Sequence, residues 1–374
     1  MSPRRNVRGL SLVFAIFSVV SVLSAQDASE LKSKAESGDV AAQSSLADAY
    51  HVGKDVPKDA AEAVRWWQKA AGNGDLESQV NLGIAYQFGA GVPKNYAAAA
   101  RWYRKGADQG NAVAQSNLAG LYHFGLGIPR DDVEAARLWQ KAAQQGVAVA
   151  QLGLGAAYQT GQGVVKNDAE AVHWFQRAAD KGNPAAQLAL GMQYVNGAGV
   201  PKDPVQGVGW IRKSAEQGNP ESQFWLGSAY EAGIGVARDD VQAILLYRKA
   251  ADQGFPPAEY NLGQAYDSGT GIAQNVVEAD RWWLKAAEHG MAEAQYNIGL
   301  AYHNGSGVEK NEVEAYFWIN LAAASLEMAS VGESRDAIEK LLTPAQIADV
   351  QARCRQWTEA HQPGSLEINL HTTH

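Results

Sequence analysis

The side chains that could carry out chemistry are few and scattered. Ser29 and Lys32 have the Ser-x-x-Lys spacing of a serine that attacks acyl groups, but the Ser-Asp-Asn and Lys-Thr-Gly motifs of such enzymes are absent from the sequence. Gly197 and Gly199 begin like a phosphate-binding loop. The sequence does not continue as Gly-x-Gly-x-x-Gly, however, and a helical pattern rather than a strand precedes it. We therefore predict no catalytic residues and no enzymatic activity.

Histidine and cysteine do not form a recognisable metal site. The eight histidines lack the His-Glu-x-x-His motif and any pair four residues apart. His51, His123 and His303 share one position of the repeat described below, but they belong to its first, third and eighth copies. The only cysteine, Cys354, excludes an intramolecular disulfide and is expected on a buried helix face. We predict neither a metal nor a cofactor.

The composition is that of a folded protein without affinity for polyanions. Hydrophobic residues make up 46% of the chain and charged residues 19%, and 32 basic against 40 acidic side chains give a net charge of −8. Nucleic acid and anionic lipid attract basic surfaces. The sequence therefore predicts that neither is the main partner.

The N-terminus has the pattern of a secretory signal peptide over residues 1–25. Three arginines precede an apolar run at residues 10–23, and Ser24 and Ala25 follow it. This run is too short to cross the roughly 30 Å of a bilayer core comfortably. We expect a periplasmic or secreted protein with no stable membrane insertion after cleavage. An uncleaved membrane anchor is the alternative.

The elements that position any binding site repeat every 36 residues. Three columns of glycine with this period begin at Gly38, Gly53 and Gly91, and they contain most of the 38 glycines of the chain. A regular period of this length indicates stacked supersecondary units. Tyrosine follows the same spacing at Tyr50, Tyr86, Tyr122, Tyr158, Tyr194, Tyr230, Tyr266 and Tyr302.

Each unit reads as two helices. In the first, Ser78, Leu82 and Tyr86 recur at helical spacing, and Gly89 ends the helix because a left-handed residue is least costly as glycine. An aspartate or asparagine opens the second helix. Glu or Gln follows three residues later in all but one unit, which predicts a capping box. These N-caps are Asp59, Asn95, Asp131, Asn167, Asp203, Asp239, Asn275 and Asn311.

The predicted fold class is all-α. We expect an α/α superhelical solenoid of about eight 36-residue helix-turn-helix repeats over residues 39–326, after an N-terminal segment with a half repeat at 26–38. Capping helices are predicted at 327–361 and a disordered tail at 362–374. A capping box at Thr343 begins the last helix, whose apolar stripe contains Ile347, Val350, Cys354 and Trp357.

The repeat resembles the Sel-one-like repeat, a subfamily of the tetratricopeptide-related helical repeats. Residues 258–290 show the motif nearly complete, with Leu262-Gly263, Tyr266, Gly269-x-Gly271, Trp282 and Ala286-Ala287. The resemblance implies a right-handed superhelix with a concave groove. Some disulfide-rich secreted members are associated with penicillin binding or β-lactamase activity, but this chain lacks their cysteine pairs.

Binding residues are predicted where packing does not dictate the side chain. Positions 78, 79, 82, 83 and 86 cluster on one side of a helical wheel, whereas positions 77, 80, 81, 84 and 88 lie opposite and vary between units. We expect the varying side, which includes Phe224, to line the concave groove. The predicted partner-binding residues are Asn81, Phe88, Asn117, Phe124, Trp225, Tyr260, Asn261, Tyr296 and Asn297.

Two interpretations of these residues stay open. Phe224, Tyr260 and Tyr296 could instead pack between adjacent first helices, and the asparagines could be structural. The leading hypothesis for function is a non-catalytic scaffold that binds a protein or peptide through the groove. The alternatives are binding of cell-wall or exopolysaccharide material, since aromatic rings also stack on sugars, and a β-lactamase-like hydrolase.

Overall fold

The computed structural model describes residues 25–361. These residues form nineteen helices and no strand, so the all-α prediction is confirmed for the described part of the chain. None of these helices is long and apolar enough to span a bilayer. The predicted signal peptide, apart from Ala25, and the predicted disordered tail lie outside the described residues.

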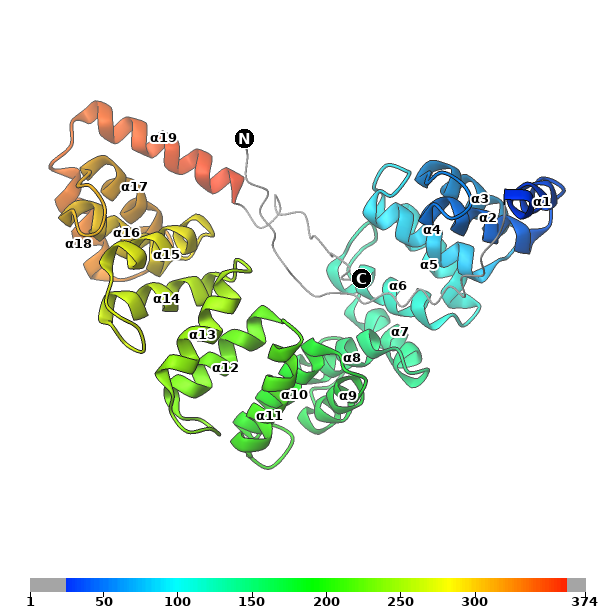
Figure 1. Ribbon diagram of the computed structural model, residues 1–374, viewed down its shortest axis with the longest axis horizontal. Coiled ribbons are helices and arrows are strands. Elements are labelled where there is room, and N and C mark those ends of the chain that lie inside the picture. The colour runs from blue at the N-terminus through cyan, green and yellow to red at the C-terminus, as the bar shows by residue number, and fades with distance from the viewer. Residues whose placement is uncertain (1–24, 362–374) are drawn as a thin grey trace. The chain divides into compact units, whose positions relative to one another are not determined.

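Eight helix pairs follow one another along the chain (Figure 1). The first helices of the pairs are α2 (Val40–Val52), α4 (Leu76–Phe88), α6 (Ala112–Phe124), α8 (Ala148–Thr160), α10 (Pro184–Asn196), α12 (Pro220–Ala232), α14 (Pro256–Ser268) and α16 (Ala292–Asn304). The second helices are α3 (Ala60–Gly72), α5 (Tyr96–Asp108), α7 (Asp132–Gln144), α9 (Asp168–Asp180), α11 (Pro204–Glu216), α13 (Asp240–Ala251), α15 (Val276–Glu288) and α17 (Glu312–Ala323). Helices α1 (Ala25–Glu36), α18 (Ala329–Glu339) and α19 (Pro344–Ala360) flank the pairs.

The chain forms two compact units. The N-terminal unit contains residues 25–186 and 198–200 of the described chain, and the C-terminal unit contains residues 187–197 and 201–361. Within each unit, a second helix packs on the first helix of its own pair and on the first helix of the next pair. Each helix therefore buries apolar surface on two sides, as stacked repeats require.

The helix ends confirm most of the predicted capping. Every predicted N-cap aspartate or asparagine of the second helices accepts a backbone N–H bond, and the glycines after the described first-helix ends are left-handed. Asp55 stands where the other repeats have glycine. It is the one non-glycine residue with a positive φ among residues 25–361.

The predicted capping boxes of the second helices are wrong. Of the described helices, only α19 has the reciprocal bond, between Thr343 and Gln346. In the second helices the N-cap N–H already donates to the carbonyl of the repeated tyrosine nine residues earlier, for example from Asp59 to Tyr50 at 2.9 Å. The N3 glutamate is thus left for other partners. Glu62, for instance, pairs with Arg65.

The two helices of a pair approach closely where the first helix has glycine. A methyl group added at Gly83 would overlap the ring of Tyr103, and one at Gly263 would lie 2.5 Å from Cδ1 of Trp283. The small residue therefore makes room for a large ring of the second helix. Tyr103 is fully buried as a result.

Helices α18 and α19 cover α17, the last second helix. Val331, Ile338, Val350 and Cys354 join the same apolar cluster as Ile319. Burial raises the pKa of the Cys354 thiol. Cys354 therefore behaves as a small core residue, as its place on the predicted apolar stripe indicates.

Candidate functional site

The candidate surface is the exposed side of the first helices, at the positions equivalent to 81, 84 and 88 of the second repeat. We call it the first-helix face and describe it separately for each unit. These positions are left at the surface because the other sides of the first helices pack against neighbouring helices. Leu82, for example, is completely buried.

In the N-terminal unit, the first-helix face carries a row of exposed apolar side chains. Val52, Phe88 and Phe124 occupy the last position of three successive first helices and are 56%, 37% and 43% exposed. Phe88 and Phe124 were predicted partner-binding residues, and the structure places both at the surface. Val52 escaped the prediction because valine at this position carries no aromatic signal.

The two predicted asparagines of this unit lie against neighbouring side chains, although Nδ2 of Asn117 has no hydrogen-bond partner among residues 25–361. Asn117 is only 4% exposed and lies against the buried hydroxyl of Tyr103, so its side chain is not presented at the surface. Asn81 is half-buried, and its Nδ2 donates to Oδ1 of Asp48 at 3.4 Å. Asp48 also accepts a bond from Nε1 of Trp67 at 2.9 Å. Burial raises the pKa of Asp48 to about 6, although the bond from Trp67 opposes the shift.

In the C-terminal unit, Trp225 is the most prominent residue of the first-helix face. Its side chain is 37% exposed, and its ring meets that of Phe224 edge-on at 5.5 Å. Phe224 in turn contacts the rings of Tyr247 and Phe255. Phe224 thus packs against rings of the C-terminal unit on one side and against the ring of Trp225 on the other.

The two predicted tyrosines of this unit are half-buried and bonded within the protein. The hydroxyl of Tyr260 accepts a bond from Nε2 of Gln264 at 2.7 Å. The hydroxyl of Tyr296 lies 3.2 Å from Oγ of Ser334 in α18. Asn261 and Asn297 are half-buried on the same helices. These contacts give both tyrosines a packing role and leave one side of each open to solvent.

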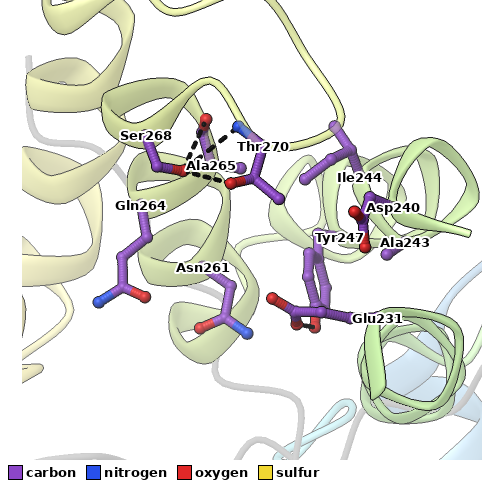
Figure 2. A pocket seen from close by; sticks show the side chains of 10 residues that line it. All are labelled: Glu231, Asp240, Ala243, Ile244, Tyr247, Asn261, Gln264, Ala265, Ser268 and Thr270. Carbon is purple, nitrogen blue, oxygen red and sulfur yellow. Dashed lines mark hydrogen bonds between the residues drawn. The ribbon is translucent and has the colours of Figure 1, made fainter. Parts of the chain in front are cut away.

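A small cavity of about 90 Å³ opens beside Asn261 (Figure 2). Asn261, Gln264 and Ser268 of α14 line one wall, and Glu231 and Tyr247 line another. The hydroxyl of Tyr247 donates to Oε2 of Glu231 at 2.5 Å and lies 3.1 Å from Oγ of Ser228. Burial first, and then the bond to Glu231, raises the pKa of Tyr247, so the phenol stays protonated. The cavity is lined mainly by hydrogen-bond acceptors and amides.

Two histidines of the described chain pair with acidic side chains of the same repeat. Among residues 25–361, no three histidine, cysteine or acidic side chains lie close enough together to hold a metal ion. Nδ1 of His123 lies 2.9 Å from Asp132, and Nδ1 of His303 lies 2.7 Å from Glu312. Each of these histidines therefore links the end of a first helix to the start of the following second helix.

Comparison with known proteins identifies the repeat. A model of the Sel1 repeat matches eight consecutive segments, at residues 40–75, 76–111, 112–147, 148–183, 184–219, 220–255, 256–291 and 292–325. The chain belongs to the Sel1 repeat family. No curated protein sequence matched it.

Two solved structures resemble this Sel1 repeat protein over most of its length. A protective antigen of uropathogenic Escherichia coli strains is 28% identical, with 93% of this chain and 99% of the antigen covered and a TM-score of 0.55. A Sel1 repeat protein from Oxalobacter formigenes is also 28% identical, with 90% and 98% coverage and a TM-score of 0.64. The arrangement of helix pairs is therefore shared with both.

Sequence reasoning missed a row of glutamines that crosses the Sel1 repeats. In each row, a glutamine of the first helix donates Nε2 to a backbone carbonyl eight residues earlier, as Gln115 does to Ala107 at 3.2 Å. In four repeats its Oε1 also accepts a bond from a glutamine thirty positions later, as Gln115 does from Gln145 at 3.0 Å, whereas Oε1 of Gln43 and of Gln151 has no hydrogen-bond partner among the described residues. The signal was visible in the sequence, because glutamine recurs with the 36-residue period at Gln43, Gln79, Gln115, Gln151, Gln187, Gln223 and Gln295.

Proposed function

We propose that this Sel1 repeat protein is a non-catalytic scaffold that works in the periplasm or outside the cell. It binds a protein partner through the first-helix face, and the site is centred on Trp225 and Asn261 of the C-terminal unit. The observation that carries the proposal is the exposed ring of Trp225. The other repeats have a small or amide residue at this position, namely Ser45, Asn81, Asn117, Gly153, Ala189, Asn261 and Asn297.

The surroundings of Trp225 support a binding role over a packing role. Its neighbour Phe224 already fills the space between α12 and the rings of Tyr247 and Phe255, so the fold does not require a second large ring here. Indole is also the side chain that most often dominates binding at protein interfaces. An exposed tryptophan on a rigid helix loses little conformational entropy when a partner covers it.

The test is affinity capture with the full chain and two single variants of matched exposure. Trp225→Ala should abolish capture of the specific partner and shift the thermal unfolding midpoint little. Leu245→Ala is the control, because Leu245 is 48% exposed but lies on α13, a second helix. Its capture should equal that of the unmodified protein. Equal capture by both variants, or a large loss of stability in Trp225→Ala, would contradict the proposal.

The alternatives have their own assays. Retention on insoluble cell wall that depends on Trp225 would favour a polysaccharide ligand, since an exposed ring can also stack on a sugar. Turnover of nitrocefin would favour a hydrolase. We expect neither with the purified chain.

A further inference from the structure

Lysine and arginine are unevenly distributed between the two kinds of helix over α11–α16 of the C-terminal unit, whereas acidic residues occur on both kinds. The first helices α12, α14 and α16 contain no lysine or arginine, whereas the second helices α11, α13 and α15 contain two each. Several of these cations lie on rings, such as Lys213 over Trp210 and Lys285 over Trp282, both at 3.8 Å. The acidic residues of the first helices are Glu221, Glu231, Glu259, Asp267 and Glu293.

Glu231 is the acidic residue of this group that lines a cavity. Its carboxylate accepts the Tyr247 hydroxyl and forms no ion pair with a described residue. The other carboxylate of the cavity, on Asp240, is already held by Arg238 through bonds of 3.0 Å to both oxygens. The charge of Arg238 also acts on Glu231, but no described cation forms an ion pair with the Glu231 carboxylate, so this carboxylate can still accept a cation of a partner. The other polar groups that line it, on Asn261, Gln264, Ser268 and Thr270, can each offer an oxygen.

The geometry points to a basic partner: we infer that the first-helix face of the C-terminal unit binds a cationic peptide segment, one lysine of which enters the cavity beside Glu231 while an apolar neighbour covers Trp225. The inference rests on the proposed function. Complementary charge is what orients such a segment and excludes acidic competitors. A basic segment would be repelled by lysines or arginines on the surface that it covers, but α12, α14 and α16 contain none.

Lysine suits this cavity better than arginine. An ammonium is a compact point charge with three donors that point in different directions. In Figure 2 the carboxylate of Glu231 and the amide of Asn261 come from two helices and face the cavity, whereas the amide of Gln264 points away from Glu231 and donates Nε2 to Tyr260. A planar guanidinium prefers a carboxylate that it can meet side by side, but one oxygen of Glu231 is already engaged by Tyr247.

The inference can be tested by selecting displayed random short peptides on the full chain. We expect lysine to be enriched close to an apolar residue in the bound sequences. For a resynthesised peptide, replacing this lysine by glutamine should weaken binding about tenfold, the size expected for a charged hydrogen bond. Glu231→Gln should have the same effect on the parent peptide and little further effect on the glutamine peptide. Raising the salt concentration should weaken the parent peptide more than the glutamine peptide.

The control variant is Glu216→Gln, because Glu216 is an exposed acid at the end of the second helix α11. It should bind the lysine peptide normally. Selection of acidic or neutral sequences, or unchanged binding by Glu231→Gln, would overturn the basic-partner inference. If Trp225→Ala still abolished binding in that case, the proposed function would stand. An arginine peptide that bound as well as the lysine peptide would overturn the assignment of lysine to the cavity.

Discussion

Oε2 of Glu259 lies 2.6 Å from Nδ1 of His289 in the glutamine row of the C-terminal unit. This is the one pair of the row in which both positions differ from glutamine. Glu259 is 1% exposed, whereas the His289 side chain is 30% exposed. The His289 side chain therefore shields a buried carboxylate from solvent, at a position where the two preceding repeats join two neutral amides.

The first prediction concerns this pair. His289→Ala should lower the free energy of unfolding by about 3 kcal/mol, because it leaves a buried carboxylate without a partner. Gln217→Ala breaks a neutral bond to Gln187 in the same row and should cost only about 1 kcal/mol. Restoring two amides with Glu259→Gln and His289→Gln together should keep the stability near that of the unmodified chain. Urea unfolding followed by circular dichroism measures all three, and equal costs for the two alanine variants would contradict the account.

The second prediction compares two glycines of first helices in the N-terminal unit. Gly83→Ala places a methyl group in the ring of Tyr103 and should destabilise by about 1–3 kcal/mol. At Gly120 an added methyl group meets open space, so Gly120→Ala should stabilise by up to about 1 kcal/mol through its helix propensity. The thermal midpoints should therefore move in opposite directions. Shifts of the same sign would show that the close approach of the two helices at Gly83 does not require glycine there.

The third prediction concerns Asp280, which is 3% exposed and stands where the other repeats have valine, alanine, isoleucine or tyrosine, with valine at Val208 for example. Its Oδ2 has no hydrogen-bond partner in the described part of the chain. Burial first, and then the charge of Asp267, raises the pKa of Asp280 from 3.8 to about 7. The unfolded chain therefore releases this proton at lower pH than the folded chain does. Stability is consequently lost as the pH rises from about 4 to about 7.

Asp280→Val should remove this dependence. At pH values above 7 it should raise the free energy of unfolding by roughly 2–4 kcal/mol, and at about pH 4 the gain should be smaller. Asp252→Asn, at an exposed aspartate of the same unit, should behave like the unmodified chain. A gain from Asp280→Val that did not change with pH would mean that the pKa of Asp280 is the same in the folded and the unfolded chain.

The fourth prediction tests the start of α19. Thr343→Ala removes the side-chain oxygen that accepts the Gln346 N–H at 3.3 Å and should destabilise α19 by about 1 kcal/mol. Thr343→Ser keeps the oxygen and should be neutral. Hydrogen exchange of the α19 amides reports this end of the molecule separately from the repeats. Equal protection in the two variants would show that Pro344 and packing on α17 suffice to begin the helix.

Sequence analysis predicted the helix pairs well because their signals are local. The N-cap at Asp59, the left-handed Gly89 and the small Gly83 each reflect a requirement of backbone geometry that the residue type reveals. The surface was harder to predict. Phe124 is exposed but Asn117, about two helical turns away on the same helix, is buried beside the hydroxyl of Tyr103 from the preceding helix.

Such contacts depend on side chains that meet only after the helices stack. The glutamine row illustrates an intermediate case. Its period was present in the sequence, but the bond from Gln145 to Gln115 joins two repeats, and no local rule predicts it. Asp280 could have been found by comparison with the uncharged residues at its position in the other repeats.

The bond from each second-helix N-cap to the repeated tyrosine carbonyl closes a loop of constant size in every repeat. An inserted or deleted residue would break this ring and shift the register of both helices. Changes in chain length are consequently tolerated only as whole repeats, which would add or remove one complete strip of binding surface. The length of ligand that such a molecule can cover should therefore change only in steps of one repeat.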